Sequence, residues 1–369
     1  MKFKEMKLGD VCDISGKSIK PVENEQYTLY SLPAYDNGKT PECVYGSSIK
    51  SNKIEFPESV ILYNKLNVKN KRVWNVVNKN ENKLCSTEYI PLMVNNNYDK
   101  DYIYYYIITE DFTNLMDGAS KGTSTSHQRI DANVLLNSKI MVPKYEIQRK
   151  ISKILREIDA KIELNNKINK NLEEQANQLY IKNLLNLDSK ITKTLDEFCN
   201  IFTGKRNANE AEEKGLYNFY TCAPDVLKIN SYIFDGPAII IAGNGAYTGR
   251  TTFYNGKFDL YQRTYACTIK KDINEIYIFL LYWMIKFELT NKIRGGTHGS
   301  AIPYIVYNDI AKYSFSYDKK IFDKISTIFH TNLKIILKNN VENESLLQIR
   351  NKLLPKLMSG EIDVSKVDI

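Results

Sequence analysis

Few side chains in this sequence have the types and spacing that catalysis or metal binding needs. The three histidines are His127, His298 and His330, and none stands near carboxylates or cysteines at the spacing of metal ligands. No Ser/His/Asp grouping is visible, and the Asn-Pro-Pro-aromatic motif with which amino-methyltransferases hold an adenine is missing. We therefore expect no catalytic residue and no bound metal, and a protein that binds or scaffolds.

Two glycine-containing segments resemble phosphate-binding loops without meeting their requirements. The segment Gly16-Lys17-Ser18 ends like a P-loop, but Val11 stands where the first glycine of that loop belongs. Residues 243–249 (GNGAYTG) continue into β-branched and aromatic residues instead of a helix, and residues 63–67 (YNKLN) offer no counterpart earlier in the chain. We expect a polar loop whose backbone approaches a phosphate, and no cofactor in this chain.

Basic and polar residues clustered in the loops are the remaining functional candidates. Arginine, lysine and asparagine read base edges in DNA, while serine, threonine and backbone amides hold phosphates. Taken singly, such residues are also ordinary solvated surface; we predict DNA contact because they cluster at matching places in two halves of the chain. The predicted DNA-binding residues are Lys17, Lys65, Lys69, Arg72, Lys121, Thr123 and Arg129 in the first half, and Lys205, Arg206, Arg250, Arg263, Arg294, Thr297 and His298 in the second.

The composition fits a two-domain protein with an anionic partner. The chain has 369 residues, of which 43% are hydrophobic and 25% charged, and a net charge of +8. That charge is compatible with nucleic acid, although Lys- and Asn-rich proteins without such a role also carry it. The six cysteines are scattered, no signal peptide is visible, and the longest apolar run (276–285) is too short to span a bilayer. We expect a reduced, cytoplasmic protein without disulfides.

The chain consists of two copies of one unit, each a mixed globular stretch followed by a long helical stretch. Residues 8–17 (LGDVCDISGK) return, one residue longer, as residues 195–205 (LDEFCNIFTGK). Farther along, Ile151 returns as Ile325, 174 residues later. Two copies are too few for a solenoid. We predict globular domains at 1–143 and 188–317, a central helix at 144–187, and a C-terminal helix and tail at 318–369.

Local patterns predict short strands within both globular stretches. The runs at 59–63, 89–94 and 238–242 are apolar, rich in β-branched residues and of strand length. Two aromatic blocks, at 102–108 and 276–287, fit a buried helix or a buried strand equally well, because periodicity alone does not separate the two.

Over residues 145–183, and again over 319–358, apolar residues recur mostly three or four apart, as in an amphipathic helix with coiled-coil spacing. Antiparallel pairing of these helices would bring Asn165 and Asn339 together near the middle, where a polar residue in an apolar seam fixes register. The alternative is that both asparagines are solvated. The predicted helix interface comprises Ile151, Ile158, Asn165, Leu172, Leu179, Ile325, Asn339, Leu346, Leu353 and Leu357.

Three motifs resemble those of the specificity subunits of type I restriction-modification systems. The repeated opening described above is similar to the start of that family's target-recognition domains, and residues 143–151 (PKYEIQRKI) resemble the proline-led start of its spacer helix. Residues 353–362 (LLPKLMSGEI) resemble its closing motif, so the resemblance covers essentially the whole chain. The second helix departs from the pattern, because residues 317–321 (YDKKI) lack the proline and the Glu-Gln pair. The first helix ends in a worn form of the closing motif at 178–182 (QLYIK), which leaves the helix boundaries open.

The resemblance implies an α+β fold: two mixed α/β target-recognition domains in tandem, each followed by a long helix, with the helices paired as an antiparallel coiled coil of pseudo-twofold symmetry. Each domain would read one half of a bipartite, asymmetric site in double-stranded DNA, and the helices would set the spacing. The chain would be a non-catalytic subunit that docks two adenine-methylating modification subunits, and S-adenosylmethionine would bind to those partners. Restriction or motor subunits would join in systems that cleave DNA. The alternative is a coiled-coil interaction scaffold that does not bind DNA.

Overall fold

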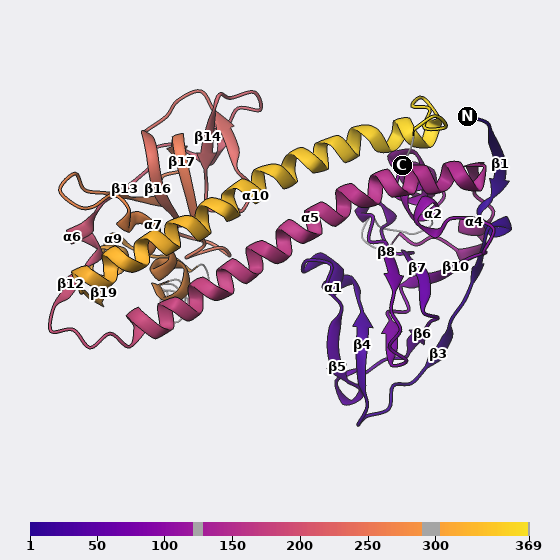
Figure 1. Cartoon of the computed structure of the whole chain (residues 1–369), viewed down its shortest axis with the longest axis horizontal. Helices are drawn as coiled ribbons and strands as arrows, with labels where there is room; N and C mark the ends of the chain where they lie inside the picture. The colour runs from indigo at the N-terminus through magenta and orange to yellow at the C-terminus, as the bar shows by residue number, and fades with distance from the viewer. Residues whose placement is uncertain (121–127, 290–302, 368–369) are drawn as a thin grey trace. The chain divides into compact units, whose positions relative to one another are not determined.

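The computed structural model of the chain describes residues 1–120, 128–289 and 303–367 and divides into two units. Unit 1 comprises Met1–Glu163 and Asn343–Ile369, and unit 2 comprises Leu164–Glu342. Each unit therefore holds one globular domain and a part of both long helices. Figure 1 gives the element labels used below.

Unit 1 begins and ends its globular domain with a pair of antiparallel strands, β1 (Phe3–Lys7) and β11 (Lys139–Pro143). Two sheets lie between them along the chain. The first has the order β2 (Cys12–Ile14), β10 (Tyr89–Val94), β7 (Ser59–Asn64) and β8 (Trp74–Val77). The second has the order β3 (Lys17–Ile19), β6 (Lys53–Glu55), β9 (Lys83–Cys85), β4 (Gln26–Tyr30) and β5 (Glu42–Tyr45). The helices are α1 (Leu32–Asp36), α2 (Lys100–Ile107), α3 (Glu110–Gly118) and α4 (Ala132–Leu136).

Unit 2 repeats this plan. Its globular domain also begins and ends with paired strands, β12 (Thr192–Thr194) and β19 (Ser314–Ser316). One sheet has the order β13 (Cys199–Thr203), β18 (Thr264–Ile269), β16 (Phe234–Ala242), β17 (Thr251–Leu260), β14 (Tyr217–Tyr220) and β15 (Leu227–Ile229). The helices are α6 (Leu195–Phe198), α7 (Tyr277–Met284) and α9 (Tyr307–Ala311).

The duplication inferred from the sequence is present in the fold. The order β2-β10-β7-β8 in unit 1 matches the order β13-β18-β16-β17 in unit 2. The strands predicted at 59–63, 89–94 and 238–242 fall in β7, β10 and β16. Both aromatic blocks, which the pattern left open between helix and strand, are helical, as α2 and α7.

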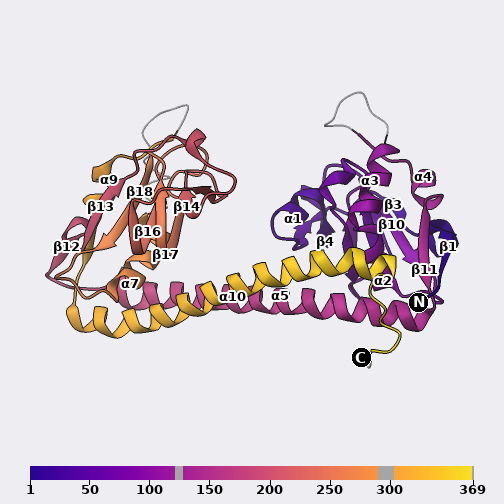
Figure 2. The same cartoon turned by 90° about the horizontal axis from the view of Figure 1, so that it is seen from above.

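The central strands are continuous apolar runs because both of their faces are covered. In β16, Ile239 and Ile241 pack against α7, while Ala238 and Ile240 lie in a second cluster on the opposite face. This alternation is the period of two that a strand imposes on its side chains. Helix α7 is buried along nearly its whole length and lies between the sheet and the two long helices (Figure 2).

The long helices α5 (Tyr145–Tyr180) and α10 (Lys319–Ser359) run antiparallel within each unit. In unit 1 the N-terminal part of α5 shares the core with the C-terminal part of α10, through Ile151, Leu155, Leu354 and Leu357. In unit 2 the C-terminal part of α5 shares the core with the N-terminal part of α10, through Leu172, Ala176, Tyr180, Phe322, Ile325 and Phe329. The predicted pairing of the helices is confirmed.

The apolar stripe is narrower than the spacing predicted. Among the predicted interface residues, Ile151, Ile325 and Leu357 are buried, and Ile158, Leu172, Leu179, Leu346 and Leu353 are half-buried. Three further apolar residues that fit the same spacing, Ile168, Ile328 and Ile349, are exposed. A straight helix turns faster than a strict heptad repeat, and a partner helix covers only one narrow face.

The two predicted asparagines lie in a polar layer within the helix pair of unit 2. The Asn165 side chain is 1% exposed and donates a hydrogen bond to the Glu342 carboxylate (2.9 Å). Asn339 donates to the Asn169 side chain (2.8 Å), and Asn169 donates in turn to Asn340 (2.9 Å). Both asparagines are therefore buried interhelical contacts and not solvated surface, although each pairs with a neighbour of the other.

Candidate nucleic-acid interface

In unit 1, three backbone hydrogen bonds tie together the loops that carry the predicted basic residues. The Lys65 N–H donates to the Glu88 carbonyl oxygen (2.9 Å), and the Ile130 N–H donates to the Lys65 carbonyl oxygen (3.0 Å). The Asn67 N–H donates to the Gln128 carbonyl oxygen (2.9 Å). The loop after β7, the turn before β10 and the segment before α4 are thereby joined. We call this arrangement the loop junction.

Unit 2 contains the same loop junction. The Gly243 N–H donates to the Arg263 carbonyl oxygen, the Ile305 N–H to the Gly243 carbonyl oxygen, and the Gly245 N–H to the Pro303 carbonyl oxygen, each at 2.9 Å. An antiparallel β-bridge accompanies the junction in both units, namely Leu66 with Arg129 and Asn244 with Tyr304. The two domains thus build the same backbone arrangement with different side chains.

The glycine-containing loop at 243–249 does have a counterpart in the first copy, which corrects our expectation from the sequence. Gly245 and Gly249 both have positive φ (82°), and so do Asn67 (51°) and Lys71 (48°) at the corresponding places of the β7–β8 loop. Asparagine adopts this left-handed conformation more readily than most residues, whereas lysine does so at a cost. The counterpart was missed because its backbone matches while its residue types do not.

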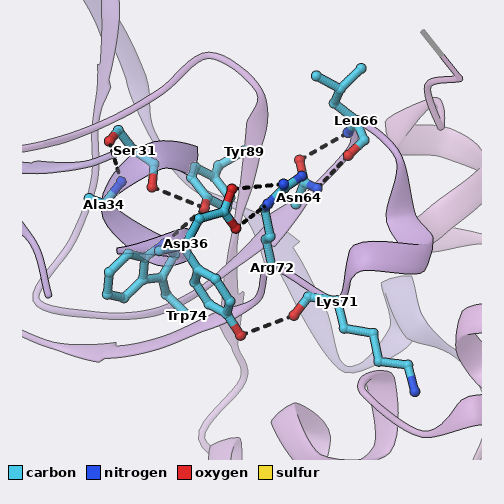
Figure 3. A network of polar contacts seen from close by, with 10 residues as sticks. Ser31, Ala34, Asp36, Asn64, Leu66, Lys71, Arg72, Trp74 and Tyr89 are labelled. Atoms are coloured by element: carbon cyan, nitrogen blue, oxygen red, sulfur yellow. Dashed lines mark hydrogen bonds and ion pairs between the residues drawn. The ribbon is translucent and has the colours of Figure 1, made fainter. Parts of the chain in front are cut away.

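Three basic residues of the β7–β8 loop are held by carboxylates. The Arg72 guanidinium makes a two-pronged contact with Asp36, with nitrogen–oxygen distances of 2.7 and 2.8 Å (Figure 3). Lys69 pairs with Asp117 (3.1 Å), and Lys71 pairs with Glu110. Asn64, at the end of β7, bonds to both the N–H and the carbonyl of Leu66. These contacts fix the shape of the loop, and Arg72 has a structural partner in addition to its predicted role at DNA.

At the junction itself, unit 1 carries a neutralised pair. The Arg129 guanidinium contacts both carboxylate oxygens of Glu88, at 2.7 and 3.2 Å. Sequence reasoning identified Arg129 but not Glu88, because 41 residues separate the two along the chain. Lys65 is half-buried beside them, and Lys17 is exposed at the first residue of β3.

The corresponding cations of unit 2 differ in their partners. Arg206 pairs with Glu210 (3.0 Å) and lies 3.8 Å from Asp259. Lys205 and Arg263 are both exposed, and among the described residues neither side chain has a hydrogen bond or ion pair. At these two equivalent places, unit 2 thus presents Lys205 and Arg263 without a side-chain partner among the described residues, where unit 1 presents Lys17 and the Glu88–Arg129 pair.

Arg250 is held in a different way. Its guanidinium donates to the Ala223 carbonyl oxygen and the Thr252 hydroxyl, and burial lowers the pKa of Arg250. Its buried Nε atom has no hydrogen-bond partner among the described residues. Arg250 thus stabilises the loop backbone at Ala223. It is half-buried, so its side chain is less accessible to a ligand than the exposed side chain of Arg263.

Five of the predicted DNA-binding residues lie outside the described residues, namely Lys121, Thr123, Arg294, Thr297 and His298. For the others the structure gives positions and partners, and their contact with DNA stays a prediction.

The side chains of the described residues form no group of three or more His, Cys, Asp or Glu that could hold a metal ion. All six cysteines are free. Burial raises the pKa of the equivalent thiols Cys12 and Cys199 to about 12, so both stay protonated at neutral pH. No described helix is both long enough and apolar enough to cross a bilayer.

The fold and the repeated junction define a protein of two tandem α/β domains joined by antiparallel helices, with basic loops at equivalent places in each domain. The family model of the type I restriction modification DNA specificity domain matches residues 1–174 and 188–346. The chain belongs to this family, as its sequence motifs indicated.

The chain is also similar to individual proteins. The specificity subunit of the type I restriction enzyme EcoDI from Escherichia coli is 35% identical over 183 residues, which make up 46% of this chain and 38% of that protein. The chain thus matches less than two thirds of the length of that relative. The type I restriction-modification S subunit from M. genitalium has the same fold, with a TM-score of 0.67 and 17% identity over 97% of this chain and 96% of that one. The HsdS subunit from Thermoanaerobacter tengcongensis aligns with a TM-score of 0.42 and 15% identity, over 98% of this chain and 97% of that one.

Proposed function

We propose that this chain is the non-catalytic subunit that gives a type I restriction-modification complex its DNA sequence specificity. Each domain reads one half of a bipartite, asymmetric site in double-stranded DNA. The observation that carries the proposal is the repeated loop junction, within a chain of the specificity-domain family. The same six backbone atoms are joined in both domains, while the side chains at the junction change from Lys65, Glu88 and Arg129 to Gly243, Arg263 and Tyr304.

A repeated backbone with altered side chains is what reading two different half-sites requires. Backbone and phosphate contacts orient a protein on the duplex, and side chains at base edges supply the sequence information. The basic net charge supports contact with the DNA backbone, and so do Lys205 and Arg263, whose side chains have no partner in residues 1–120, 128–289 and 303–367.

The partners follow from the same proposal. Two modification subunits dock on the chain, bind S-adenosylmethionine and methylate adenine, and restriction subunits join where the system also cleaves DNA. The helix pair supports such docking, because α5 and α10 keep exposed apolar residues, among them Leu164, Ile168, Ile328 and Leu347. The assembly works in the cytoplasm, where its DNA is.

An adenine-methylation map of host DNA, with the gene intact and with the gene deleted, tests the proposal directly. The expected result is a two-part motif that is methylated only when the gene is present. An unchanged map from cells that express the whole assembly contradicts the proposal and favours the interaction scaffold.

Replacing residues 188–317 by the corresponding domain of another specificity subunit tests the assignment of one half-site to each domain. Only one half of the methylated motif should change. A change in both halves contradicts the two-reader arrangement.

A further inference from the structure

Arg263 of unit 2 combines a backbone held by hydrogen bonds with an exposed side chain. It lies in the turn between β17 and β18, its side chain is exposed, and it has no hydrogen bond or ion pair among the described residues. It lines a polar pocket of about 220 Å³ together with Gly243, Gln262, Tyr265 and Ile305.

The backbone that presents Arg263 is held on both sides. Its carbonyl oxygen accepts from the Gly243 N–H (2.9 Å) and from the Cys222 thiol (3.3 Å). The preceding residue, Gln262, donates its N–H to the Arg206 carbonyl oxygen (2.9 Å), and the following residue, Thr264, is fully buried. The turn therefore holds the Cα of Arg263 in place while its guanidinium reaches into solvent, which is the arrangement that reading one defined base pair needs.

Unit 1 supplies the contrast that points to specificity. The carbonyl oxygen of Glu88 takes the same place in the loop junction as that of Arg263, but the Glu88 carboxylate is neutralised by Arg129. The equivalent position thus holds an arginine without a partner among the described residues in one domain, and a glutamate paired with an arginine in the other.

We propose that Arg263 reads a guanine edge at one position of the half-site recognised by unit 2. The guanidinium carries parallel donors that match the O6 and N7 acceptors of guanine in the major groove, and this match is the commonest specific contact between arginine and DNA. Lys205, which also lacks a side-chain partner among the described residues, contacts phosphate, for which a compact point charge suffices. The inference rests on the proposed function and adds the base class and the residue that selects it.

The test uses the whole chain assembled with its modification subunits. The DNA probes are duplexes that carry the methylated motif, with each base pair of the second half-site replaced in turn. Three variants are compared with the unchanged chain, namely Arg263→Ala, Arg263→Lys and, as the matched free cation, Lys205→Ala. Since Arg263 and Lys205 are exposed and have no side-chain partner within the part of the chain that the structure describes, these variants should fold normally.

Arg263→Ala should abolish discrimination at a single G·C pair, lowering affinity for the intended motif on the order of 5- to 150-fold and leaving the first half-site unaffected. Arg263→Lys should lose that discrimination too, because lysine keeps the charge without the paired donors. Lys205→Ala should weaken all probes alike and flatten the salt dependence.

Three results overturn the inference: a second half-site that contains no G·C pair, an Arg263→Ala variant that weakens all probes equally, and one that changes nothing. These results are distinct from a failure of the proposed function. If the unchanged assembly prefers no DNA sequence, the proposed function is wrong. If the unchanged assembly does prefer a sequence and the Arg263→Ala variant keeps that preference, only the role of Arg263 is wrong.

Discussion

The two domains share a strand order but differ in how far their sheets continue. In unit 2, β16 and β17 form one long ladder that carries β14 and β15 on its far end, so that six strands make a single sheet. In unit 1 the same path is broken: β7 pairs with β8, and β6 pairs with β9 in a separate sheet. The parallel contact survives in both, as β4 with β9 and β14 with β17.

Residue types explain the difference. In unit 2, Gly236 and Gly256 stand opposite each other in the ladder with φ values of 137° and 142°, which non-glycine residues rarely adopt, and the pairing continues past them. In unit 1 no glycine stands at the corresponding places, and residues 56–58 (FPE) separate β6 from β7 while residues 78–82 (NKNEN) separate β8 from β9. The end of each domain that carries the loop junction is retained while the opposite end varies. Contact between the loops thus places a stronger constraint on the fold than continuity of the sheet.

The largest expected effect concerns the position where α5 and α10 join their domains. Phe322 is fully buried against aromatic rings in unit 2, and the equivalent residue of unit 1 is Gln148, which is 1% exposed. We expect Phe322→Ala to lower the free energy of unfolding of unit 2 by about 3–5 kcal/mol, because it leaves a cavity among the rings. Urea denaturation followed by circular dichroism measures the loss.

At the position equivalent to Phe322, Gln148 is held by hydrogen bonds instead of ring packing. Its amide donates to the Pro143 carbonyl oxygen (2.9 Å) and its carbonyl accepts from the Asp99 N–H (2.9 Å). Gln148→Ala leaves the Pro143 carbonyl and the Asp99 N–H without their hydrogen-bond partner. We therefore expect the free energy of unfolding of unit 1 to fall by about 1–3 kcal/mol. Ile328→Ala, at an exposed position of α10, is the control and should change stability by less than about 0.5 kcal/mol. Equal losses for Phe322→Ala and Ile328→Ala would contradict the packing described here.

A second prediction addresses the continuous sheet. Gly256→Ala places an L side chain at a positive-φ position opposite Gly236. We expect it to lower the free energy of unfolding of unit 2 by about 1–2 kcal/mol. The neighbouring exposed Asn255 provides the control, Asn255→Ala, which should be nearly neutral. Thermal unfolding of the two variants measures the difference. A Gly256→Ala variant as stable as the control would show that the glycine pair is not what keeps the ladder continuous.

Much of the scaffold could be predicted from the sequence, and most of the junction could not. Apolar runs such as 238–242 identified strands, because a strand covered on both faces leaves no room for polar side chains. The αL conformation of Lys71 has no signature in its residue type. Glu88 and Arg129 meet only after the chain has folded, and nothing local to either residue indicates the other. The exposure of Ile349 likewise depends on which face of α10 the partner helix covers.

A smaller effect is expected at the neutralised pair of unit 1. Glu88→Gln removes a carboxylate from the junction and frees Arg129, so the assembly should bind DNA with a log–log salt slope steeper by about one. The pair is partly exposed, so stability should change by no more than about 1 kcal/mol. Titrations at several salt concentrations measure the slope, with Glu213→Gln as the control on an exposed residue of unit 2. An unchanged slope would place Glu88 away from the DNA.

The smallest effect on stability at neutral pH is expected from Cys12 and Cys199, which occupy equivalent places in the two units. Burial raises the pKa of Cys12 and of Cys199 to about 12, above the value of about 8.5 expected in the unfolded chain. The stability that the neutral thiols contribute is therefore full below about pH 8.5 and is lost as the pH rises towards 12. In timed alkylation at pH 8, the exposed Cys43 should react first, and Cys12 and Cys199 only as their domains unfold. Rapid labelling of Cys12 in the folded protein would contradict its burial.

The paired strands that open and close each domain, β1 with β11 and β12 with β19, have a consequence for inheritance. Because the first and last strands of a domain lie side by side, everything between them is attached to the helices at one narrow point. A recombination event with crossovers in these two strands would replace the whole reading surface and leave the helix pair unchanged. If the chain has the function that we propose, a lineage acquires a new half-site in this way in one genetic step, and the helices that dock its partners stay the same.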